Sequence, residues 1–138
     1  MAGQSIPQGP GNAVPHTEKR SYKCAGTIAR GDLVTFSGDD GYSIVACTNV
    51  LPPIGVAQDA GGVSGDWIEI VICGFCNYLT CTATNIVDKD LLYSDASADA
   101  AGVTVGDDLG TEVGSLVGMS LQAQAGTTLT AAYIFKKV

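Results

Sequence analysis

The chain is 138 residues long and carries 14 acidic side chains against seven lysines and arginines, which gives a formal net charge of −7. This length fits one domain with a modest hydrophobic core. An acidic surface repels phosphate backbones, so we expect no direct binding to nucleic acid. No apolar run reaches the roughly 18 residues of a membrane span, and the first residues lack an apolar signal segment. We therefore expect neither a membrane partner nor secretion.

The composition predicts an all-β fold. Val, Ile, Ala and Leu dominate the apolar residues, the chain holds 18 glycines, and the Glu, Lys and Arg that usually cover helices are few. Charge is distributed unevenly, because residues 1–30 contain four basic side chains and one acidic, whereas residues 31–135 contain one Lys and thirteen acids. The protein therefore has a basic beginning and an acidic body.

Residues 1–21 are predicted to form an extended arm, and residues 22–138 a single β domain. The arm is rich in Gly and Pro, and Ile6 and Val14 are its only sizeable branched apolar residues, so it cannot bury enough surface to fold alone. Its prolines favour polyproline-like segments, which lose little entropy on binding. The arm is either a docking element or a terminus without a role, and the sequence leaves both interpretations open.

From residue 22 onward, short apolar segments alternate with turn residues such as Gly, Asp and Pro. The stretch 66–74 has the clearest pattern, because its alternation places Ile68, Ile70 and Ile72 on one face of a strand. Residues 111–125 also suit a helix, yet their glycines favour a strand, and we allow at most one short helix within 86–115. The predicted strands are residues 22–29, 33–36, 42–48, 54–57, 66–74, 77–84, 116–121 and 127–136.

A weak internal repeat links two parts of the chain that lie about sixty residues apart. Asp32-Leu33 matches Asp90-Leu91, Gly55 matches Gly118, and the segment 66–71 matches the segment 128–134. Two copies are too few for a solenoid, which needs about three repeats to bury a continuous core. We therefore expect one compact β domain built from two similar halves.

Residues with catalytic or metal-binding chemistry are sparse. The single histidine, His16, lies in the arm, where no neighbour fixes its orientation, so we expect no catalytic residue and no enzymatic activity. Cys73, Cys76 and Cys81 have no fourth zinc ligand near them in sequence, and we expect neither a metal nor another cofactor. All five cysteines, which include Cys24 and Cys47, are predicted to be buried thiols in a reducing compartment.

Three short motifs have structural explanations. Arg30-Gly31-Asp32 matches an adhesion tripeptide, but the repeat at Asp90 indicates that Asp32 opens a strand. The acidic stretch 38–41 lacks the spaced oxygen ligands of a calcium loop and is predicted to be a hairpin turn. The Gly-rich stretch 61–65 lacks the Lys-Ser/Thr of a phosphate loop.

The order of the motifs resembles that of tailed-bacteriophage capsid decoration (cement) proteins of the DUF2190-like family, over about residues 25–137. The matching segments are residues 31–34, 53–57, 65–70, 90–95 and 117–120. The chain departs from the family pattern in having Lys89-Asp90 where Gly-Asp is usual, in its cysteine-rich middle and in its longer arm.

The resemblance implies a small β-tulip or β-clip-like barrel of short antiparallel strands that forms a homotrimer. Such a protein binds the major capsid protein on the outside of a phage head, stabilises the head without turnover, and is assembled in the host cytoplasm. The candidate trimer contacts are Trp67, Phe75 and Tyr78. The candidate capsid-binding residues of the arm are Ile6, Pro7, Val14, Pro15, Lys19, Arg20, Tyr22 and Lys23. The alternative is a β-clip module that binds a small ligand or a glycan, such as a host-surface adhesin.

Overall fold

The computed structural model describes residues 17–47, 52–58, 60–82, 86–94, 102–105, 115–124, 126–129 and 131–135. Within these ranges the chain forms thirteen β-strands and no helix, which confirms the predicted all-β class. No helix in the described ranges is therefore long and apolar enough to cross a membrane. The strands are β1 (Thr17–Cys24), β2 (Ile28–Ala29), β3 (Leu33–Phe36), β4 (Ser43–Ala46), β5 (Gly55–Ala57), β6 (Gly61–Gly62), β7 (Trp67–Cys76), β8 (Leu79–Thr80), β9 (Leu91–Ser94), β10 (Val103–Val105), β11 (Leu116–Ser120), β12 (Thr128–Leu129) and β13 (Ala132–Ile134).

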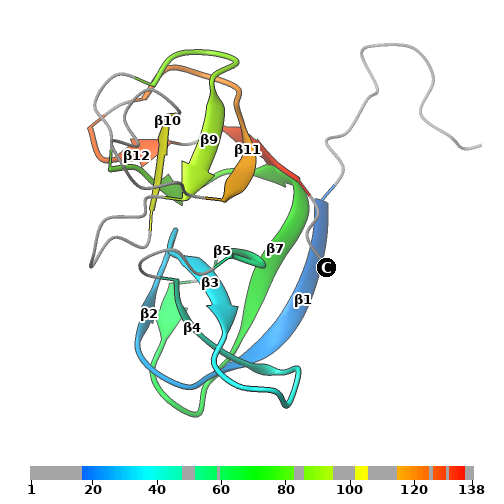
Figure 1. The fold of residues 1–138 in the computed structure, drawn as a ribbon. Coiled ribbons are helices and arrows are strands. Elements are labelled where there is room, and N and C mark those ends of the chain that lie inside the picture. The colour runs from blue at the N-terminus through cyan, green and yellow to red at the C-terminus, as the bar shows by residue number, and fades with distance from the viewer. Residues whose placement is uncertain are drawn as a thin grey trace, which may run out of the picture.

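Nine of these strands form one sheet that closes on itself in its first half. The strand order is β1-β4-β3-β5-β7-β13-β11-β9-β10, and β1 also pairs with β7. The five strands β1, β4, β3, β5 and β7 therefore form a closed barrel. Figure 1 shows this barrel as the lower part of the molecule, with the long strand β7 running up into a second part built around β9, β11 and β13. Closure leaves few unpaired strand edges.

The pairing is antiparallel, as predicted, with two exceptions among the described residues. Strands β1 and β4 run parallel, and an isolated parallel bridge joins Cys81 to Val103. Strands β3 and β4 form an antiparallel hairpin, and β1 is not part of it. Strand β1 lies between β4 and β7 and closes the barrel by pairing with both.

The described residues form two hydrophobic cores, one inside the barrel and one shared by the two halves, and β7 contributes to both. Ile68, Ile70 and Ile72 are 5%, 0% and 0% exposed and fill the barrel, which confirms the predicted strand face. The other barrel residues are Tyr22, Cys24, Ile28, Val34, Ile44, Ile54 and Ala57. The second core lies between the halves, where Leu33, Val56 and Val71 on the outside of the barrel pack in one cluster with Leu92, Val117 and Ile134. Each fully buried side chain of this size contributes about 1.5–3 kcal/mol.

The internal repeat of the sequence is also a repeat in the structure. Strands β3, β5 and β7 pair in the same order and direction as β9, β11 and β13. The registers also correspond: Leu33↔Val56, Val34↔Gly55 and Val56↔Val71 in the first half match Leu91↔Met119, Leu92↔Gly118 and Met119↔Tyr133 in the second. This confirms the prediction of two similar halves.

One turn recurs at the start of β3, β7 and β9. In each copy an Asp carboxylate accepts a hydrogen bond from the backbone N–H three residues earlier, and the residue just before the Asp has a positive φ. The N–H donors are Ala29, Val63 and Val87, each 2.9 Å from Asp32, Asp66 and Asp90 respectively. The positive φ values are 87° at Gly31, 99° at Gly65 and 70° at Lys89. Lys89, a departure from the family pattern, thus keeps the turn's backbone conformation.

The structure corrects the predicted boundaries at several places. Residues 17–21, assigned to the arm, belong to β1, because their backbone pairs with β7 from Thr17↔Gly74 onward. Within the described part of the predicted strand 77–84, residues 77–82, the strand is limited to Leu79–Thr80, and the predicted strand 127–136 is divided between β12 and β13. The predicted strand 22–29 is interrupted after Cys24, because the chain turns there to form β2 against β6. Of the stretch that allowed a helix, the described parts 86–94 and 102–105 contain β9 and β10.

Candidate functional site

The predicted capsid-binding residues fall into two groups. Ile6, Pro7, Val14 and Pro15, like His16, lie outside the described residues. The remaining four, Lys19, Arg20, Tyr22 and Lys23, lie on β1. Lys19 and Arg20 are exposed, and Arg20 forms an ion pair of 3.2 Å with Glu18 on the same strand.

Tyr22 does not fit the predicted binding role. Its side chain is 5% exposed and belongs to the barrel core, where its ring meets Phe36 edge to face with centroids 5.7 Å apart. The alternation of β1 turns Tyr22 inward, so the basic strand presents Lys19 and Lys23 but not this aromatic ring to a partner.

Strand β1 is firmly tied to the body from its first residue. Residues 17–23 pair with β7, with one register shift between Glu18 and Lys19. The Thr17 hydroxyl donates a hydrogen bond of 3.0 Å to the carbonyl of Phe75. Whatever precedes Thr17 is therefore attached directly to the strand that both halves share.

A polar groove of about 280 Å³ lies beside the start of β1. Its lining contains two cationic side chains, two side-chain amides and one aromatic ring; the full set is Thr17, Lys19, Arg30, Gln58, Val71, Phe75 and Asn77. An anion such as a carboxylate suits this lining, because Lys and Arg supply charge-assisted donors.

The groove is partly organised before any ligand enters. The Arg30 guanidinium lies 4.4 Å from the centroid of the Tyr78 ring, which is within range of a cation–π contact. The Gln58 amide donates to the carbonyl of Tyr78 at 2.9 Å and accepts from the N–H of Asn77 at 3.3 Å. Sequence reasoning missed this groove, because its residues come from two strands and three separate loops and show no common spacing.

The three candidate trimer contacts do not form one cluster. Trp67 and Phe75 lie near opposite ends of β7, eight residues apart, which corresponds to at most about 26 Å along the strand. Trp67 is 59% exposed, whereas Phe75 is half-buried. Tyr78 packs under Arg30 and against Gly31 and is not presented on the β7 surface.

Trp67 forms an exposed aromatic pair with Tyr42. The two rings are stacked at a centroid distance of 5.9 Å and an interplanar angle of 17°, and Tyr42 is 46% exposed. Asp40 fixes the turn that carries Tyr42 by accepting hydrogen bonds from the N–H groups of Tyr42 and Ser43 and from the Ser43 hydroxyl. These bonds, led by the one from the hydroxyl, lower the pKa of Asp40. The acidic stretch 38–41 is thus part of the β3–β4 hairpin, as predicted.

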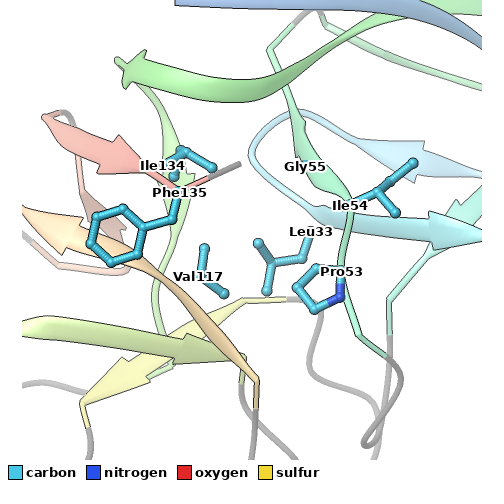
Figure 2. A pocket seen from close by; sticks show the side chains of 7 residues that line it. All are labelled: Leu33, Pro53, Ile54, Gly55, Val117, Ile134 and Phe135. Carbon is cyan, nitrogen blue, oxygen red and sulfur yellow. The ribbon is translucent and has the colours of Figure 1, made fainter. Parts of the chain in front are cut away.

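The junction between the two halves contains an apolar gap of about 10 Å³ (Figure 2). Leu33 and Pro53 approach it from the barrel, and Val117, Ile134 and Phe135 approach it from the second half. A volume of this size is at the lower limit for one water molecule, and the lining offers such a molecule few polar partners. The gap is therefore a packing feature and not a ligand site.

The cysteines behave as buried thiols, as predicted, except for the half-buried Cys73. All five are free. Burial raises the pKa of Cys47 and Cys76 to about 11 and that of Cys81 to about 12, so these thiols are protonated at neutral pH.

Within the described ranges, no three His, Cys, Asp or Glu side chains are grouped so that they could hold a metal ion.

Arg30-Gly31-Asp32 is a structural turn in this protein. The guanidinium lies on Tyr78, Gly31 has a positive φ, and the Asp32 carboxylate is bound to the N–H of Ala29. Strand β3 begins at the next residue, which confirms that Asp32 opens a strand.

Comparison with known proteins identifies the fold. No protein-family model and no curated protein matches the chain, so the resemblance to the decoration family is not confirmed. A solved structure does match: the head fiber gp8.5 N base of bacteriophage phi29 aligns with a TM-score of 0.55 over 89% of this chain and 98% of that chain, at 16% sequence identity. The chain thus shares the fold of that base.

Proposed function

We propose that this chain is a structural protein of a phage virion: a homotrimeric decoration protein, without enzymatic activity, that binds the outer surface of the head and stabilises it. The observation that carries the proposal is the fold shared with a phage head fiber base, which extends over 89% of this chain and 98% of that one. The motif order over residues 25–137 favours the same class of protein independently of the fold.

The attachment of β1 supports a mechanical role for the segment that precedes it. Residues 1–16 lead into Thr17, which is bonded to Phe75, and the following residues pair with β7 through the length of the barrel. A contact made by residues 1–16 on a capsid subunit is thereby connected to both cores. Three such contacts in a trimer bind with a high effective concentration, so individually weak contacts suffice.

The first test is a truncation that begins at Thr17. A deletion that extends into β1 would remove strand pairs from the barrel, whereas removal of residues 1–16 leaves β1 intact. We expect residues 17–138 to keep the circular dichroism spectrum of the full chain and to lose most cosedimentation with purified heads. Equal cosedimentation of the two proteins would exclude residues 1–16 as the anchor.

The second test reverses the charge of β1. The double variant Lys19→Glu and Arg20→Glu changes two exposed side chains and should weaken head binding and reduce its dependence on salt, since exposed charges are screened within about 10 Å at moderate ionic strength. Lys89→Glu is the matched control, because Lys89 is exposed and lies in the second half. Lys89→Glu changes the net charge half as much as the double variant, so a control effect of half the size or more would make net charge and not β1 responsible.

A glycan-binding function is the second candidate, and the pair Tyr42–Trp67 is the observation in its favour. Two stacked, exposed aromatic rings offer a flat apolar surface with polar edges, of the kind that recognition sites use. Titration of the protein with oligosaccharides, followed by the fluorescence of its single tryptophan, tests this directly. A saturable change that is lost in Tyr42→Ala would favour this function over the first.

A further inference from the structure

Four apolar side chains form a continuous row across the second half of the sheet. Leu91 on β9 is paired with Met119 on β11, Met119 with Tyr133 on β13, and Tyr133 with Phe75 on β7. Residues that are directly paired project on the same side of a sheet. Leu91 and Tyr133 are 47% and 41% exposed, and Met119 and Phe75 are half-buried. We call these four residues the apolar row.

The apolar row contrasts with the outer surface that β1 and β7 form on the barrel. Antiparallel sheets that face water usually carry polar side chains on that face. On the barrel, β1 and β7 follow this rule with Lys19, Ser21 and Glu69, and Trp67 at the far end of β7 is an exception. The apolar row does not, and the ring of Phe135 extends it by lying 6.2 Å from that of Tyr133.

In the first half of the molecule, the residues that match the apolar row are buried. In the repeat, Leu33, Val56 and Val71 occupy the register positions of Leu91, Met119 and Tyr133. These three are 1%, 0% and 0% exposed, because the second half of the chain packs over them in the shared core. The same face is therefore a packing surface in one copy of the repeat and open in the other.

The basic side chains next to the apolar row indicate which kind of partner would bind there. The row ends at Phe75, which also lines the groove that holds Lys19 and Arg30. A partner must therefore be apolar where it meets the row and acidic where it meets the groove. The chain itself has both properties, with one Lys against thirteen acids over residues 31–135 and an apolar row of its own. Uncharged centres with charged rims are typical of protein interfaces.

We propose that copies of this chain associate with one another through the apolar row, with Tyr133 at the centre of the contact and the groove of Lys19 and Arg30 at its rim. The inference rests on the proposed function in taking the working form to be an assembly of copies. Of the candidate trimer contacts, it retains Phe75 and leaves Trp67, which lies at the other end of β7, outside the interface.

The test is sedimentation equilibrium of the full chain over a wide range of concentration. We expect an oligomer whose dissociation constant rises at least about tenfold in Tyr133→Lys and, separately, in Leu91→Lys, as is usual when a buried interface anchor is lost. Both side chains point to solvent in the single chain, so both variants should fold, and circular dichroism checks this. Val63→Lys is the matched control, because Val63 is an exposed apolar residue of the barrel half, at 57%.

Each outcome decides the inference. A full chain that is monomeric at every concentration overturns it, as does an oligomer that persists in both folded row variants. An oligomer that is lost on removal of residues 1–16, but not in the row variants, also overturns it. Cosedimentation with heads separates this from the proposed function: a monomer that binds heads contradicts the inference and the trimeric state but leaves the head-binding function standing, whereas an oligomer that does not bind heads contradicts the head-binding function and leaves the inference standing.

Discussion

Lys89 occupies a backbone conformation that favours glycine. Its φ is 70°, and the equivalent turns have glycine at this position. A left-handed conformation costs a residue with a Cβ about 1–2 kcal/mol, part of which is offset by the greater freedom of glycine in the unfolded chain. We predict that Lys89→Gly raises the free energy of unfolding by about 0.5–1 kcal/mol, measured by urea denaturation.

The reciprocal change at Gly65 is the control for this prediction. A Cβ there would meet no atom within 4 Å, so Gly65→Ala reports the backbone conformation alone, with φ at 99°. It should lower the free energy of unfolding by about 1 kcal/mol or more. A destabilised Lys89→Gly would mean that the Lys89 side chain makes a contact worth more than the strain.

The buried thiols predict how stability depends on pH on the alkaline side. The pKa of Cys76 is raised from 9.0 to about 11 by burial, so the folded state holds its proton where the unfolded state releases it. The stabilisation is fully present below pH 9 and is lost as pH rises towards 11. Urea midpoints at increasing pH should therefore fall over this window, and less steeply in Cys76→Ala. Identical slopes in the two proteins would contradict this assignment.

At the scale of elements, the central strand of each half depends on one glycine. A Cβ on Gly55 would lie 2.4 Å from the carbonyl oxygen of Val71, and one on Gly118 would lie 2.0 Å from that of Tyr133. Backbone atoms cannot move aside as side chains do, so we predict that Gly55→Ala and Gly118→Ala each destabilise the protein by about 3 kcal/mol or more. Gly38→Ala is the control, because a Cβ there meets nothing within 4 Å. Thermal unfolding of the three variants measures the difference.

The elements that sequence alone predicted best are those with a two-residue period. Strand β3 has the predicted bounds, and β7 buries the three predicted isoleucines, because alternation reports directly on a sheet with one covered face. The prediction for the segment 77–84 was wrong in extent: within its described residues Leu79–Thr80 pair with β12, and Cys81 makes an isolated bridge to Val103 instead of continuing that strand. The groove could not be predicted, since Arg30, Gln58 and Asn77 meet only after the barrel has closed.

At the scale of the whole molecule, the shared core should make the two halves unfold together. Leu92 in the second half is 0% exposed and lies in one cluster with Leu33 and Val71 of the barrel. We predict that Leu92→Ala lowers the free energy of unfolding by about 2–5 kcal/mol. The transition seen by Trp67 fluorescence, which reports on the barrel, should coincide with that seen by circular dichroism. Separate midpoints would show that the halves unfold independently.

The pairing of β1 with β7 has a mechanical consequence. A pull on the chain ahead of Thr17, directed along β1, slides that strand past β7, so the backbone hydrogen bonds between them are strained together and not broken one after another. The parallel contact of β1 with β4 adds resistance at the far end of the same strand. We therefore expect a tension applied ahead of Thr17 to be borne by the seam between β1 and β7, so that the other strands of the barrel need no special strength.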